Sequence, residues 1–168
     1  MPSRRRPLLV AAAKEPVEVD PGGAVAAIDA TQLPEPPAAA AGPPPRVYLN
    51  LADIEGDANP GIVYEVYLNL PDDAPERVRD EHRVGVVSFF GIEQSTPAGA
   101  AASGQAAHGM RYSFDVTDEV NRLRSGADWD PANLRVTLRP VEGSGEQDRA
   151  AAGADRPIRI GTIGLYQG

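Results

Sequence analysis

The sequence contains no cysteine and only two histidines, and aromatic residues make up 5% of it. Without cysteine the chain forms no disulfide, thiolate metal site or cysteine nucleophile. A catalytic zinc ion needs about three protein ligands, and a dinuclear copper centre needs about six imidazoles. We interpret His82 and His108 as solvated loop residues, because two histidines cannot build a dicopper centre.

Other signatures of enzymes and membrane proteins are also missing. No glycine-rich loop with Lys-Ser/Thr joins a strand to a helix, which argues against a P-loop. Ser88 and Ser113 lie in predicted strands without a nearby histidine, which argues against nucleophilic catalysis. No stretch approaches the ~18 apolar residues of a membrane span. We therefore expect a non-enzymatic protein without a cofactor.

The chain is acidic, with a net charge of −8 and a pI near 4.7. Phosphate binding requires a basic surface, so this charge argues against nucleic acid as the main partner. It argues equally against binding to an anionic membrane. The simplest role of the acidity is solubility.

The first 13 residues contain a basic cluster, residues 4–6, followed by a short apolar run at 8–13. This order resembles an export signal, but the run is marginal in length and Lys14 and Glu15 end it. We favour a linker or short strand. With no convincing signal peptide, a cytoplasmic location is favoured.

The chain contains 17 glycines and 17 prolines, and this composition favours short strands joined by turns. Residues 1–45 are predicted to be linker-like, with a possible hairpin at 16–29 around the Asp-Pro-Gly-Gly turn. Residues 30–45 are rich in proline and alanine, which is typical of an extended strap. The core domain is predicted to span residues 46–168.

Within that domain, apolar and polar residues alternate with the period of half-buried strands. The predicted strands are residues 46–51, 62–70, 83–92, 110–116, 134–139 and 158–166. The 83–92 segment is uniformly apolar and is expected to be central, and the apolar phase of the last strand slips at Gly161, which indicates a bulge. One short helix is predicted at about residues 117–125, capped by Asp115 or Thr117. The fold class is mainly β, an antiparallel sandwich or barrel.

Two groups of residues are candidate binding sites. Asp53, Glu55 and Asp57 place oxygen donors at alternate positions, as calcium loops do, but the later positions of such a loop are not matched. We therefore treat them as a weak calcium candidate. Tyr48 and Tyr67 are out of phase with the aliphatic faces of their strands, so they are candidate anchors for a partner protein.

Several segments, in this order, resemble the region C-terminal to the copper domain in bacterial tyrosinases. They are RVYLNL (46–51), DANPG (57–61), VYEVYLNLP (63–71), SFFGIE (88–93), YSFDV (112–116) and LRVTLRP (134–140). The ending PIRIGTI (157–163) is similar to the closing strand of the plant polyphenol oxidase C-terminal domain, whose opening strand also looks like residues 46–50. Residues 8–19 look like the segment that joins the two domains in the bacterial proteins.

The resemblance implies a β-sandwich or barrel that packs on a type-3 copper domain, shields the dicopper entrance and can hold the enzyme latent. The copper domain and its histidine motifs are absent from this sequence. The implied partner is thus a tyrosinase-like copper domain, in cis in relatives and in trans here. The blocking residue of the family lies in a loop that does not align, so none is assigned.

Two functions are compatible with these features. The first is a non-catalytic accessory domain that shields or stabilises a tyrosinase-like catalytic domain. The alternative is an independent β-sandwich that binds a carbohydrate or a small ligand, possibly with calcium held by Asp53, Glu55 and Asp57. The first needs an exposed apolar or aromatic patch on a rigid sheet, together with loops able to plug a cleft.

Overall fold

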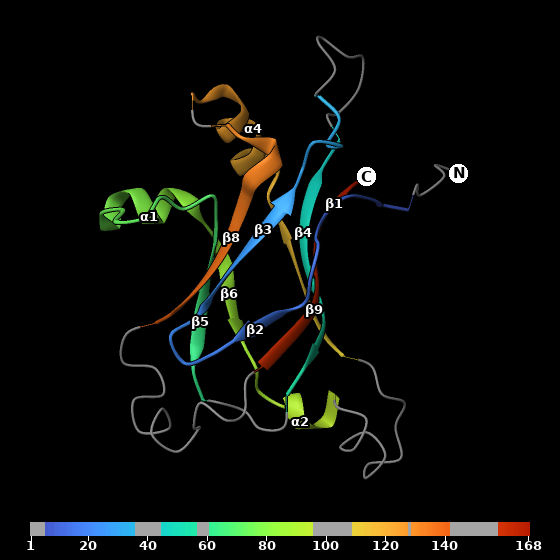
Figure 1. The fold of residues 1–168 in the computed structure, drawn as a ribbon, viewed down its shortest axis with the longest axis vertical. Coiled ribbons are helices and arrows are strands. Elements are labelled where there is room, and N and C mark those ends of the chain that lie inside the picture. Colours follow the sequence, from blue (N-terminus) through green and yellow to red (C-terminus); the bar gives the residue numbers. More distant parts are fainter. Residues whose placement is uncertain (1–5, 36–44, 57–60, 96–108, 128, 142–157) are drawn as a thin grey trace.

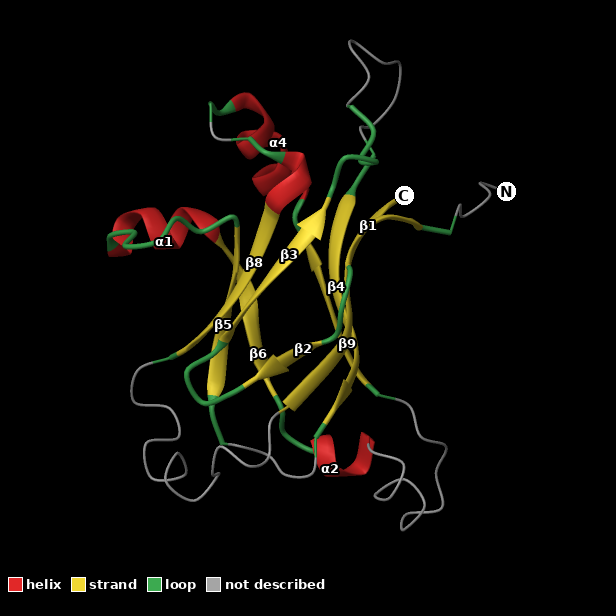
Figure 2. Ribbon diagram, in the orientation of Figure 1, coloured by secondary structure: helices red, strands yellow, loops and turns green. Residues whose placement is uncertain are grey.

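In the computed structural model the described residues are 6–35, 45–56, 61–95, 109–127, 129–141 and 158–168. They form a nine-stranded antiparallel sheet that is nearly closed into a barrel, which confirms the predicted fold class (Figures 1 and 2). The strands are β1 Leu8–Ala13, β2 Val17–Val19, β3 Ala24–Asp29, β4 Val47–Glu55, β5 Val63–Leu68, β6 Arg83–Ser88, β7 Met110–Asp115, β8 Leu134–Pro140 and β9 Ile158–Gln167. The helical segments are α1 Glu76–His82, α2 Ile92–Ser95, α4 Thr117–Ser125 and a 3-10 turn at Pro131–Asn133.

Around the barrel the strands follow the order β6-β5-β8-β3-β1-β9-β4-β7, with β2 paired to β9. The longest pairing joins β4 to β9, from Val47 opposite Gln167 to Glu55 opposite Arg159. The apolar phase of β9 slips at Gly161 as predicted. Opposite this point Asp53 of β4 has a positive φ of 52°, and the β4–β7 register shifts between Leu51 and Ile54. The β4–β9 register is continuous here, so the irregularity lies in β4 and not in the bulge predicted for β9.

The N-terminal segment differs from the linker-like stretch that the sequence predicts for residues 1–45. Residues 8–29 form β1, β2 and β3, and β1 lies between β3 and β9 in the barrel wall. Ala11, Val19 and Ile28 from these strands belong to the core. The physical reason is that β1 and β3 are held by pairing with the distant strands β9 and β8, which their linker-like composition does not reveal.

The predicted hairpin at 16–29 is present only as its turn. Gly23 has a φ of 103°, and its N–H donates to the carbonyl of Asp20 at 3.0 Å, while the Asp20 side chain accepts from the N–H of Gly22 at 2.7 Å. Beyond the Asp20–Gly23 bridge the two arms diverge, because β2 pairs with β9 and β3 pairs with β8. The turn thus redirects the chain across the barrel wall.

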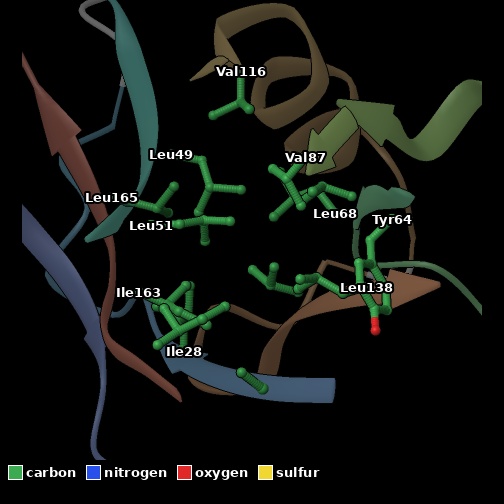
Figure 3. Packing of buried hydrophobic residues seen from close by; sticks show 14 of the residues in the cluster. Ile28, Leu49, Leu51, Tyr64, Leu68, Val87, Val116, Leu138, Ile163 and Leu165 are labelled. Atoms are coloured by element: carbon green, nitrogen blue, oxygen red, sulfur yellow. The ribbon is translucent and has the colours of Figure 1, made fainter. Parts of the chain in front are cut away.

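The core fills the barrel interior and consists of inward-facing residues from most strands (Figure 3). Leu49 and Leu51 of β4 face Tyr64 and Leu68 of β5 across the interior, and all four are no more than 1% exposed. Alternation along each strand places the intervening residues outside. Val116, at the start of α4, closes one end of the core.

Side chains close the seam between the edge strands β6 and β7. The Tyr112 hydroxyl donates to the carbonyl of Ser88 and accepts from its N–H at 3.3 Å. The Phe114 ring lies against Gly85, where a Cβ would be 2.5 Å from its Cδ1 atom. The predicted central strand is therefore an edge strand, and its glycine makes room for the aromatic ring that completes the wall.

The predicted helix at 117–125 is confirmed as α4. The predicted cap is wrong, because the N-cap residue is Val116, which makes no side-chain capping hydrogen bond. The Asp115 carboxylate accepts hydrogen bonds from the N–H and hydroxyl of Thr117, at 3.1 and 2.6 Å, and Val120 is fully buried. Helix α1 is an additional element that the sequence does not signal, because its residues ERVRDEH have no apolar stripe. Among the helices within the described ranges, none is both long and apolar enough to cross a bilayer.

Candidate functional site

Two of the three predicted calcium residues, Asp53 and Glu55, lie near the end of β4. Asp53 is exposed and accepts a hydrogen bond from the Thr162 hydroxyl at 3.2 Å, and Glu55 follows two residues later on the same strand. Asp57 lies outside the described residues. Within the described part of the chain, no group of three or more His, Asp or Glu side chains could hold a metal ion. The calcium site thus stays a prediction.

Tyr48 lies on the outer face of the barrel. It pairs with Tyr166 of β9, which pairs in turn with Leu9 of β1, so the three side chains form a row across three strands. Both tyrosines are half-buried and Leu9 is 53% exposed. This placement leaves Tyr48 accessible, and its role as an anchor stays a prediction.

Tyr67, the second predicted anchor, is only 3% exposed. It faces outward from β5, and it lines a hollow that Arg79 of α1 also lines. Its hydroxyl donates to the Glu65 carboxylate at 2.5 Å, and burial together with this hydrogen bond raises the pKa of Tyr67 to about 12. Because α1 packs on β5, a residue expected at the surface is covered.

Neither predicted loop histidine can be assigned to chemistry. His82 ends α1, and its Nδ1 atom lies 2.9 Å from the carbonyl oxygen of Leu68. That contact ties the helix to the end of β5, so His82 has a structural partner instead of the solvated position expected. His108 lies outside the described residues.

A different aromatic residue stands out at one end of the barrel. Phe90 is 80% exposed, the highest value for a large apolar side chain among the described residues. It occupies a β-turn in which the N–H of Ile92 donates to the carbonyl of Phe89 at 3.1 Å, with Gly91 at a φ of 78°. These features are those of a type II turn, whose third residue needs positive φ.

The Phe90 turn is held rigidly from both sides. Phe89 and Ile92 are fully buried, and the Phe89 ring packs against Tyr64 with the ring centroids 5.6 Å apart. Ile92 begins α2, which lies at the same end of the barrel (Figure 1). We call residues 89–92 the Phe90 turn. It presents one aromatic ring to solvent on a fixed support.

Sequence reasoning missed this turn because it extended the apolar strand to residue 92. The strand ends at Ser88, and the next four residues form the turn. Two signals were available: adjacent phenylalanines in a strand must face opposite sides, and the glycine that follows Phe90 suits the third position of a type II turn. Together they indicate that one ring leaves the core.

The chain is similar to one family model and to part of one known protein. A family model described as a domain of unknown function (DUF7868) matches residues 3–168. The chain is also 28% identical, over 151 residues, to the tyrosinase HcTyr1 of Hahella sp. (strain CCB-MM4). That similarity covers 86% of this chain but 29% of the relative, so the chain spans less than a third of the relative's length. These findings are consistent with a tyrosinase-associated domain.

Proposed function

The chain belongs to the family described as a domain of unknown function (DUF7868), and on that premise we propose that it is a tyrosinase-associated accessory domain. It packs on a tyrosinase-like type-3 copper catalytic domain, which it shields or stabilises, and it carries out no chemistry itself. Support comes from the similarity to one part of a tyrosinase. The two histidines of the chain leave the copper chemistry to the partner.

The Phe90 turn is the observation that carries this proposal. Burying a phenylalanine side chain contributes about 1.5–3 kcal/mol, and here most of the ring remains in water until a partner covers it. Aromatic anchors of this kind dominate the energetics of protein interfaces. Because Phe89 and Ile92 fix the turn, little conformational entropy is lost when Phe90 is ordered against a partner.

The position of Phe90 also suits a shielding role. The ring projects from a turn at the end of the barrel, beyond the two buried residues that flank it. A single rigid ring can enter the opening of a concave active site, whereas the flat outer row of Leu9, Tyr166 and Tyr48 can only lie against a surface. We therefore assign the occluding contact to Phe90 and a supporting contact to Tyr48.

The proposal is tested by adding the purified chain to a tyrosinase from which the segment similar to this chain has been removed. Complex formation is followed by size-exclusion chromatography with light scattering, and activity by diphenol oxidation. The expected result is a one-to-one complex with a reduced rate of oxidation or a raised melting temperature of the enzyme. A matched amount of serum albumin controls for nonspecific effects. No complex and no change in rate or stability would refute the proposal.

A further inference from the structure

A polar hollow of about 500 Å³ lies outside the barrel wall, between α1 and β5, and the end of β8 also lines it. Its walls come from α1, β5, the start of β6, the end of β8 and the turn between β2 and β3. Five of its side chains matter for its chemistry: Glu65, Tyr67, Arg79, Arg83 and Arg139. Three arginines from three different elements thus meet in one place on a chain whose net charge is −8.

The central carboxylate of the hollow is already engaged. One oxygen of Glu65 accepts the Tyr67 hydroxyl at 2.5 Å, and the other lies 3.0 Å from the Arg83 guanidinium. The hydrogen bond from Tyr67 and the ion pair with Arg83 lower the pKa of Glu65, so the carboxylate is charged at neutral pH. Asp80 is the second partner of Arg83, at 3.6 Å. Arg83 therefore pairs with Glu65 and Asp80, while Arg79 lies near enough to Glu65 to contribute to its lowered pKa without an ion pair.

The other two arginines have no such partner. Within the described residues, neither the Arg79 nor the Arg139 side chain makes a hydrogen bond or ion pair, and the Nε atom of Arg79 is buried without an acceptor. A buried donor left without a partner costs about 1–3 kcal/mol, and more when it is charged. An exposed carboxylate, Glu76, lines the hollow but is not bonded to either arginine.

We propose that Arg79 and Arg139 bind a small oxyanion, a carboxylate or a phosphate group, in this hollow. Each guanidinium presents five N–H donors in a planar fork that matches two oxygens of such a group. Charge-assisted bonds of this kind are about twice as strong as neutral ones. This site is independent of the Phe90 turn and of the proposed tyrosinase partner.

The support for the two arginines is rigid. Arg139 lies on β8 directly opposite Glu65 of β5 in the sheet register, and Arg79 is held on α1. Helix α1 is itself fixed at its end by His82 and by the hydrogen bond from Arg122 of α4 to the Glu81 carbonyl. These contacts fix the backbone positions of the two arginines, so binding has to order only their side chains.

The test is isothermal titration calorimetry of the full chain at low ionic strength, because salt screens exposed charges. The probes are inorganic phosphate and succinate, in separate titrations. We expect at least one of them to bind, and Arg139→Gln to weaken that binding by about tenfold or more. Arg139 is exposed, so this variant should fold normally. Arg111→Gln, an exposed arginine of β7 outside the hollow, is the matched control and should bind as wild type.

Each outcome decides the proposal. Binding of phosphate alone identifies a phosphate group as the ligand, and binding of succinate alone identifies a carboxylate. Arg79→Gln should weaken binding as Arg139→Gln does, while its melting temperature reports whether α1 remains docked. Absence of binding by both anions up to about 10 mM, or equal affinities for Arg139→Gln and Arg111→Gln, would overturn the proposal.

Discussion

Replacement of Gly85 by alanine tests how the barrel is closed. In a strand, alanine is ordinarily more stable than glycine by roughly 0.5–1 kcal/mol, because the unfolded chain loses less entropy. At Gly85 the added methyl group would lie 2.5 Å from Cδ1 and 3.2 Å from Cζ of Phe114. Carbon atoms pack best at about 3.5–4.0 Å, so the ring must move by about an ångström.

Overpacking of this kind costs about 1–3 kcal/mol, which exceeds the gain from replacing glycine. Gly85→Ala should therefore lower the free energy of unfolding by about 1–2 kcal/mol. In a Phe114→Ala background the obstructing ring is absent, and the same change should raise stability by roughly 0.5–1 kcal/mol. The contact between Gly85 and Phe114 is thus expected to reverse the sign of the stability change that Gly85→Ala causes.

Urea denaturation followed by circular dichroism measures all four proteins of this double-mutant cycle. Gly126→Ala serves as a control, because its new Cβ would meet nothing closer than 3.4 Å. If Gly85→Ala is neutral or stabilising with Phe114 present, the seam is not packed as described. If the destabilisation persists without Phe114, its cause is not the aromatic ring.

Two further predictions concern hydrogen bonds. Thr117→Ala removes the hydroxyl oxygen that accepts a hydrogen bond from the Val47 backbone nitrogen at 2.9 Å. We expect urea denaturation to show a loss of about 1–3 kcal/mol in the free energy of unfolding, whereas Thr117→Ser should be close to wild type. Equal free energies of unfolding for the two variants would contradict this role. The pKa of Glu65 is lowered in the folded state, mainly by Tyr67, so its contribution is present at neutral pH and is lost as the carboxyl is protonated in acid. The pKa of Tyr67 is raised to about 12, so its contribution is lost as pH rises from about 10 to about 12. Tyr67→Phe should weaken the loss of stability in acid and the loss between about pH 10 and 12, as measured by melting temperature against pH. An unchanged pH profile would refute the interaction between Tyr67 and Glu65.

Much of the fold could be predicted from local sequence patterns. Alternation in β4, β7 and β8 predicted strands close to those observed, and the charge order around Val120 predicted α4. The first strand was not distinguishable from a linker, because its partner is at the other end of the chain: Leu8 pairs with Gln167. Local composition carries no information about such a distant pairing.

The candidate site was harder to predict from the sequence, because the exposure of a side chain depends on tertiary packing. Tyr48 and Tyr67 have the same relation to their strands, yet α1 packs on β5 and only Tyr67 is buried. Helix α1 has no apolar stripe, so its docking could not be anticipated. Phe90 was assigned to a strand because four of the seven residues before it are valine or phenylalanine, which favour strands, and only the turn at Gly91 exposes it.

We propose that this domain covers a tyrosinase-like partner through the Phe90 turn. The direct test is the affinity of Phe90→Ala for a tyrosinase that lacks the corresponding segment, compared with wild type and with Val25→Ala, an exposed apolar residue on β3. Because Phe90 is 80% exposed, its removal should leave the melting temperature unchanged. Binding should be weakened by about tenfold or more for Phe90→Ala only. Equal affinity for all three proteins would contradict it.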